Sequence, residues 1–142
     1  MGKILCATRG GEASYRTQDA AVALSKDEGS DLVFIYVVDI SFINKTAYAV
    51  RPDVVTTEIE KMGEFLLIMA QERAQKQGVS AEVVLHHGDF RSELIDCARE
   101  LEIDLILLGK PIGEDSVFEL EKIKSFATEL EAETGIEVRI VG

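Results

Sequence analysis

Hydrophobic positions along the chain alternate between short continuous runs and longer stretches with helical spacing. The apolar run Lys3–Thr8 predicts a strand, and Ala13–Glu28 predicts a helix that stops at Gly29, a residue suited to a left-handed cap. The nearly uninterrupted apolar run Leu32–Asp39 is typical of a strand buried on both faces of a parallel sheet. The same reading predicts helices over Asp53–Gln77, Phe90–Leu101 and Val117–Thr134, and strands over Ala81–His87, Asp104–Leu108 and Ile136–Val141.

Five strands and four helices in strict alternation predict an α/β fold: one five-stranded parallel sheet with right-handed crossovers and helices on both faces. Charged strands belong at sheet edges. The third strand opens with Glu82, and the last strand carries Glu137 and Arg139 between its apolar positions. This pattern favours the strand order 3-2-1-4-5. The segment Ile40–Pro52 is expected to be a packed loop, with a lid as the alternative.

Composition places the chain among single-domain proteins with a hydrophobic core. It has 142 residues, 46% of them hydrophobic, which fits one domain over residues 1–142. The longest apolar run, Leu32 to Val38, is too short to span a bilayer, and the N-terminus lacks a signal-peptide layout, so we expect a cytoplasmic protein. The formal net charge of −11 argues against nucleic acid and against an anionic membrane. Cys6 and Cys97 lie in apolar patterns and are expected to be buried, reduced thiols.

A ligand site is expected where the strand order reverses, beyond the carboxyl ends of the first and fourth strands. The loops that begin there are Thr8-Arg9-Gly10-Gly11 and Gly109-Lys110-Pro111-Ile112-Gly113. Both are rich in glycine, and each brings one cation. Asp39 and Gly88 follow the neighbouring strands. The sequence therefore predicts a crevice suited to a nucleotide or another anion.

Other polar residues near this edge have more than one interpretation. Adjacent strand residues point to opposite faces, so His86 and His87 make a poor metal site, and we expect them to hydrogen-bond to backbone. Arg9 is either a phosphate anchor or the salt-bridge partner of Asp39 or Asp89. Asp39 either binds a sugar hydroxyl or caps the following turn. We find no nucleophile elbow, full P-loop or Cys–His arrangement, so no catalytic residue is assigned.

Several segments, in order, resemble the universal stress protein family. They are Lys3–Ser14, Val37-Val38-Asp39, Gly88-Asp89, Asp104–Gly109 and Ser116-Val117. The resemblance spans essentially the whole chain. It implies a cytoplasmic protein with an adenine-nucleotide-hydrolase-like, Rossmann-like three-layer fold, usually dimeric through the last strand, in a family of which some members bind ATP. The nucleotide-contacting positions that it implies here are Thr8, Arg9, Gly10, Val38, Asp39, Gly88, Leu108, Gly109, Lys110, Gly113, Ser116 and Val117.

The chain departs from the family's nucleotide-binding pattern. Arg9 stands where binding members usually place an Asp, and only six residues separate Gly109 from Ser116, about seven fewer than the family's phosphate loop. Asp115 replaces the expected glycine, and with Glu114 it puts negative charge at a helix N-terminus that would otherwise attract phosphate. Ser116-Val117-Phe118-Glu119 is also a capping box, which would occupy the same N–H donors.

We therefore predict a non-enzymatic, stress-response regulatory protein without family-type ATP binding, without a cofactor and without a metal. The first alternative is a switch that binds ATP or AMP, with Mg²⁺, through Arg9 and Lys110. The second is an enzyme on the same nucleotide-handling fold.

For partners, we expect a homodimer in which the stripe Ile136, Val138 and Ile140 of the last strand pairs with a second copy. The alternative is that the last helix covers this stripe within one chain. Other protein partners are possible, and neither nucleic acid nor membrane is expected.

Overall fold

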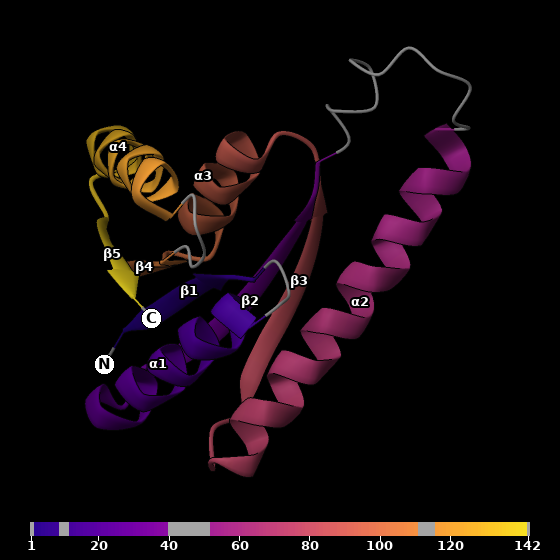
Figure 1. The fold of residues 1–142 in the computed structure, drawn as a ribbon. Helices are drawn as coiled ribbons and strands as arrows, with labels where there is room; N and C mark the ends of the chain where they lie inside the picture. Colours follow the sequence, from indigo (N-terminus) through magenta and orange to yellow (C-terminus); the bar gives the residue numbers. More distant parts are fainter. Residues whose placement is uncertain (1, 9–11, 40–51, 111–115, 142) are drawn as a thin grey trace.

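The protein was analysed as a computed structural model that describes residues 2–8, 12–39, 52–110 and 116–141, with backbone alone at residues 12, 13, 52 and 116–119. Strands and helices alternate from end to end (Figure 1). The elements are β1 (Lys3–Ala7), α1 (Glu12–Glu28), β2 (Asp31–Val38), α2 (Pro52–Lys76), β3 (Ala81–His87), α3 (Phe90–Glu100), β4 (Leu105–Gly109), α4 (Ser116–Thr134) and β5 (Glu137–Val141). Each helix and strand begins and ends within one residue of the bounds predicted from the sequence. Of the predicted loop Ile40–Pro52, only Pro52 lies within the described residues, and there it begins α2.

The sheet has the order β3-β2-β1-β4-β5, and every neighbouring pair is parallel, as predicted. β1 lies at its centre, where Cys6 is paired with Phe34 of β2 and with Leu107 of β4. All three side chains are buried. The continuous apolar runs of the central strands follow from this position, because both of their faces are covered.

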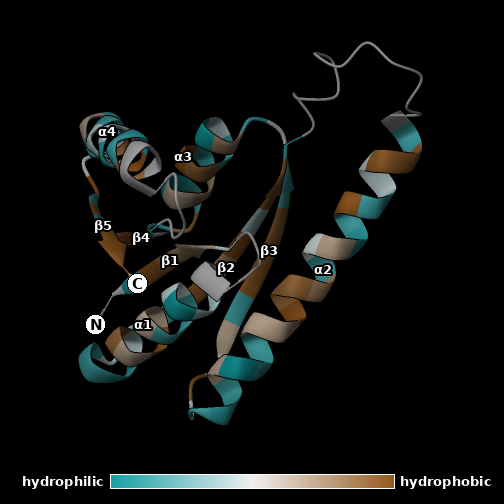
Figure 2. Ribbon diagram, in the orientation of Figure 1, coloured by the Kyte–Doolittle hydropathy of each residue, from teal (hydrophilic) through white to brown (hydrophobic). Residues whose placement is uncertain are grey.

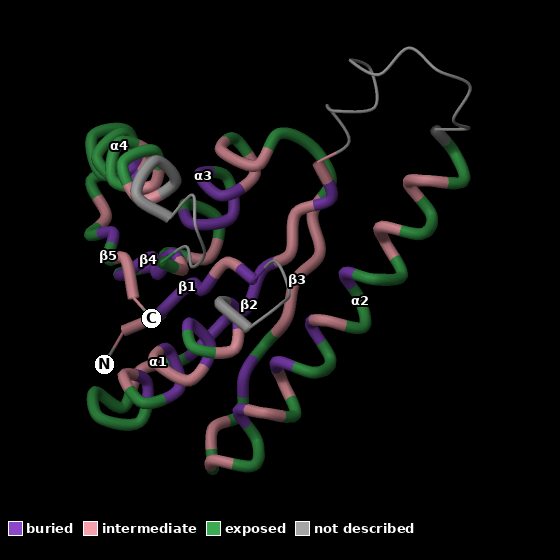
Figure 3. Tube along the Cα trace, in the orientation of Figure 1, coloured by how far each residue is buried: buried purple, intermediate pink, exposed green. Residues whose placement is uncertain are grey.

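Helices α1 and α2 cover one face of the sheet, and α3 and α4 cover the other (Figure 1). Successive residues of β1 divide between the two layers: Ile4 and Cys6 pack on the α1 and α2 side, while Leu5 packs on the α3 and α4 side. Buried positions therefore concentrate along β1, β2 and β4 (Figure 3).

Helix α2 approaches the sheet closely at Gly63. A Cβ placed there would lie 2.4 Å from Cδ1 of Tyr36 and 3.0 Å from Cδ1 of Leu85. Glycine is thus the residue that lets the helix backbone rest on these two side chains. None of the helices in the described ranges combines the length and hydropathy needed to cross a membrane.

Candidate functional site

A buried polar floor lies at the carboxyl end of β1, beside the point where the strand order reverses. The Thr8 amide donates to the Ile35 carbonyl at 2.9 Å, which continues the β1–β2 pairing by one residue. Its hydroxyl accepts from the Gln18 side-chain amide at 3.0 Å. Gln18 Oε1 is buried and has no hydrogen-bond partner within the described part of the chain. A buried polar atom of this kind is costly to leave unpaired, so it marks the floor as a place suited to a hydrogen-bond donor.

The end of β4 closes the other side of this floor. A Cβ at Gly109 would lie 2.5 Å from the hydroxyl oxygen of Thr17, so the glycine makes room for a buried side chain of α1. The next residue, Lys110, is exposed, and its amide donates to the Val141 carbonyl at 2.8 Å. Lys110 therefore places one cation at the switch point, on a backbone held by β5.

A second group of polar residues lies beyond the ends of β2 and β3. Asp39 Oδ2 accepts from the Phe90 amide at 3.1 Å, and Asp89 Oδ2 accepts from the amide of Ser92 at 3.0 Å. Asp89 is thus the N-cap of α3. Gly88 donates to the Val38 carbonyl and has a φ of +139°, a backbone conformation that favours glycine. Asp39 therefore holds the first residue of α3, a contact that was not considered from the sequence.

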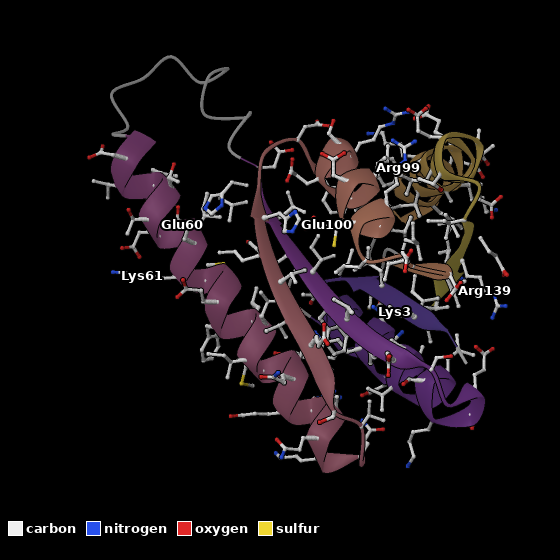
Figure 4. The ribbon with its side chains drawn as sticks, turned by 180° about the vertical axis from the view of Figure 1, so that it is seen from behind. Lys3, Glu60, Lys61, Arg99, Glu100 and Arg139 are labelled. Carbon is white, nitrogen blue, oxygen red and sulfur yellow. The ribbon has the colours of Figure 1, made fainter. Side chains whose placement is uncertain are left out.

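The two histidines at the end of β3 point to opposite sheet faces, as predicted, but their partners differ from the prediction. His86 Nδ1 lies 3.1 Å from Glu93 of α3, and His87 Nε2 lies 2.9 Å from Glu60 of α2. Figure 4 shows Glu60 on the side of α2 that faces this strand end. The expectation of backbone partners is therefore wrong. That expectation did not allow for the carboxylates that the flanking helices of this acidic chain place within hydrogen-bond distance of the two rings.

The described residues include no obvious activated nucleophile. Burial raises the pKa of the Cys6 thiol to about 12. Burial, with Glu100 and Glu93 nearby, raises that of Cys97 to about 11. Both thiols therefore stay protonated at neutral pH. Within the same residues, no group of three or more histidine, cysteine or acidic side chains is placed to hold a metal ion.

The structure distributes the predicted site residues over distinct roles. Val38 and Leu108 are buried, and Leu108 packs in the core on the α3 and α4 side. Arg9, Gly10 and Gly113 lie outside the described residues. Ser116 and Val117 open α4, but the side chains that would form the predicted capping box are also outside the description.

Sequence reasoning missed the contribution of α1 to the floor. The buried residues of this helix follow one another at steps of three, one and three; they are Ser14, Thr17, Gln18, Ala21, Val22 and Ser25. The first three of these residues are polar, the next two are apolar, and the last is polar again. The signal was therefore present in the sequence, as hydroxyl and amide side chains at positions where helical spacing requires burial.

Comparison with known proteins agrees with this architecture. The model of the universal stress protein family matches residues 1–112. The chain is 31% identical over 116 residues to the universal stress protein YxiE of Bacillus subtilis, an alignment that covers 77% of this chain and 78% of the relative.

Solved structures show the same fold. A universal stress protein family member from Burkholderia pseudomallei superposes with a TM-score of 0.72 at 24% identity, covering 99% of this chain and 95% of that one. A family protein from Arabidopsis thaliana with AMP bound gives a TM-score of 0.67 at 13% identity, with 99% and 91% covered. The five-stranded parallel sheet between two helical layers is thus an α/β, Rossmann-like fold. Within that class, the chain belongs to the universal stress protein family.

Proposed function

We propose that this chain is a non-enzymatic, cytoplasmic regulatory member of its family that does not bind ATP in the manner of the nucleotide-binding members. The observation that carries this proposal is that polar groups beyond β2 and β3 already have partners within the protein. Asp39 holds the Phe90 amide, Asp89 caps α3, and both histidines lie against glutamates. A nucleoside entering there would have to compete with these internal hydrogen bonds.

The short connection after β4 also supports the proposal. Lys110 is tied to β5 through its amide, and α4 begins at Ser116, so only residues 111–115 connect the two. Two of these, Glu114 and Asp115, are acidic. A triphosphate would therefore have little loop backbone to surround it, and it would meet carboxylates at the helix N-terminus.

A second candidate function is the binding of a nucleoside monophosphate. It is favoured by Gln18 Oε1, which has no hydrogen-bond partner among the described residues of the buried floor, and by the exposed cation of Lys110 beyond it. A monophosphate carries less charge than a triphosphate and does not need a long loop. The related Arabidopsis protein was solved with AMP bound.

Calorimetric titration separates these functions. The purified protein, first checked for copurified nucleotide, is titrated with Mg-ATP and with AMP. We expect no binding heat with Mg-ATP, and micromolar Mg-ATP binding would overturn the proposal. If AMP binds, Gln18→Leu should abolish its heat and Gln75→Leu, an exposed control on α2, should not.

We also propose a homodimer through the last strand, β5. Val138 is buried in the core beside α4, and Ile136 and Ile140 are partly buried against that core. What remains for a partner is the outer backbone edge. There Glu131 Oε1 of α4 accepts from the Val138 amide at 2.9 Å and covers part of the strand.

The β5 contact can be tested by removing this cover. Glu131→Ala frees the Val138 amide, so it should tighten a dimer that forms by strand pairing, as measured by sedimentation velocity. Glu129→Ala, an exposed residue of the same helix, is the matched control. An unchanged or weakened dimer in Glu131→Ala would contradict assembly through this edge.

A further inference from the structure

The outward face of α2 carries a cluster of exposed apolar side chains. The exposed fractions are 59% for Met62, 60% for Phe65, 52% for Ile68 and 38% for Met69. The opposite face of the same helix packs on the sheet through its buried positions, which are Gly63, Leu67, Ala70 and Ala74. Figure 2 shows the apolar residues in the middle of α2, and Figure 3 shows exposed positions recurring along it. The four side chains lie within eight consecutive residues of one helix, and a contiguous exposed apolar patch is often functional.

Charged residues border the apolar cluster in a particular order. Glu58 and Lys61 precede it, and Glu72 and Lys76 follow it, so that each side presents an acid and then a base. All four are exposed, and none forms an ion pair with another described residue. Lys61 points away from the sheet (Figure 4). If the sequence order of one border is reversed, each of its charges is matched by the opposite charge in the other border.

The spacing on this face is that of a helix-pairing seam. Glu58, Lys61, Phe65, Ile68 and Glu72 follow one another at alternating steps of three and four residues. This is the repeat by which two helices pack side by side. The seam is apolar at its centre and charged at both ends, and the helix of 25 residues is long enough to present all of it.

Two copies of α2 match when they run antiparallel about a two-fold axis between residues 66 and 67. In that register Lys61 faces the partner's Glu72, and Phe65 faces the partner's Ile68. The symmetry repeats both contacts, as an isologous interface requires. A parallel pair would instead set every residue against its own copy, so Lys61 would face Lys61.

We propose that the outward face of α2 is a self-association surface, on which a second copy of this chain docks its own α2 antiparallel. The charge order argues for this occupant, because the face is complementary to itself. The apolar patch is smaller than a standard interface of about 800 Å² per partner, so the contact is expected to be weak and concentration-dependent. α2 covers β2 and β3, far from the edge strand β5, so both contacts can form in one assembly (Figure 1).

Charge reversal tests the register. Lys61→Glu sets two glutamates against each other at both symmetry-related positions, and Glu72→Lys does the same with two lysines. Each single variant should raise the dissociation constant at least about tenfold in sedimentation experiments. The double variant K61E/E72K restores opposite charges and should return to within about threefold of the unaltered chain. Only an antiparallel contact between copies predicts this rescue.

A charged residue placed at an apolar position, with a matched control, completes the test. Phe65→Glu should abolish the contact. Val54→Glu, at another exposed apolar position of α2, should not, because residue 54 would lie beyond the end of the partner helix. Both changes are made also in an Ile140→Pro background, which removes an amide from the β5 edge. A chain that is monomeric in that background at all concentrations, or whose association ignores Phe65→Glu and the charge reversals, would overturn the proposal.

Discussion

Replacing Gly63 with alanine sets two effects of known sign against each other. In an exposed helix interior, alanine is favoured over glycine by about 1 kcal/mol. At Gly63 the added Cβ would lie 2.4 Å from Cδ1 and 2.7 Å from Cε1 of Tyr36, and 3.0 Å from Cδ1 of Leu85. Contacts this short require the ring or the helix to move.

The cost of the steric overlap should exceed the gain in helix propensity. Overpacking a filled site costs about 1–3 kcal/mol, and here three carbon atoms on two strands must give way to one methyl group. After the gain in helix propensity, we expect Gly63→Ala to lower the free energy of unfolding by about 1–2 kcal/mol. For a chain of this length, that corresponds to a fall in Tm of roughly 3–8 °C.

Thermal and urea unfolding measure the effect, and a double-mutant cycle assigns it. Tyr36→Leu removes the ring, so Gly63→Ala should cost at least about 1 kcal/mol less in that background. Ser125→Ala, at an exposed position of α4, reports the propensity gain without a clash. If Gly63→Ala stabilises the protein as Ser125→Ala does, the close approach of α2 to the sheet is not a constraint and the reasoning is refuted.

Three further outcomes are expected. Asp89→Ala removes the N-cap that accepts from the Ser92 amide, and it should lower the free energy of unfolding by about 1 kcal/mol in urea titrations; an unchanged midpoint would contradict the capping role. The Arg73 guanidinium holds the pKa of Asp19 below its ordinary value, so this pair stabilises the fold above the unfolded-state pKa and loses its effect as pH falls through the folded-state pKa. Asp19→Asn should therefore reduce the loss of unfolding free energy as the pH is lowered. The reduction should be modest because both side chains are partly exposed, and an unchanged loss would show that the pair contributes nothing. Cys6, whose pKa is raised to about 12, should react with a thiol reagent only after unfolding; rapid labelling of the native protein would show that its burial is wrong.

The fold was predictable because its signals are local and repetitive. The apolar runs of β2 and β4 identify them as central strands, and Glu82 and Arg139 mark β3 and β5 as edges. The helix ends at Gly29, Gly78 and Gly135 have φ values of +65°, +85° and +71°, which glycine adopts easily. Each signal lies within one element, so its meaning does not depend on distant contacts.

The site was less predictable because its residues are held by partners far away in the sequence. Asp39 meets the Phe90 amide 51 residues later, and His87 meets Glu60 across 27 residues. In a chain with 26 acidic residues, nothing in the sequence selects one carboxylate over another. The outward face of α2 was missed for a different reason: its periodic apolar residues predict a helix, but they do not all face the core.

The buried stripe of α1, which is polar at Thr17 and Gln18 and apolar at Ala21 and Val22, imposes two rules of mutational tolerance on one helix. Around Ala21 and Val22, any apolar side chain of similar volume can replace another, because dispersion contacts have no direction. Around Thr17 and Gln18, an apolar substitute of the same volume would leave a buried polar neighbour such as Thr8 without a donor. Sequence drift should therefore be slow at the end of α1 that lies over the switch point and faster toward its middle, within a stretch of three helical turns.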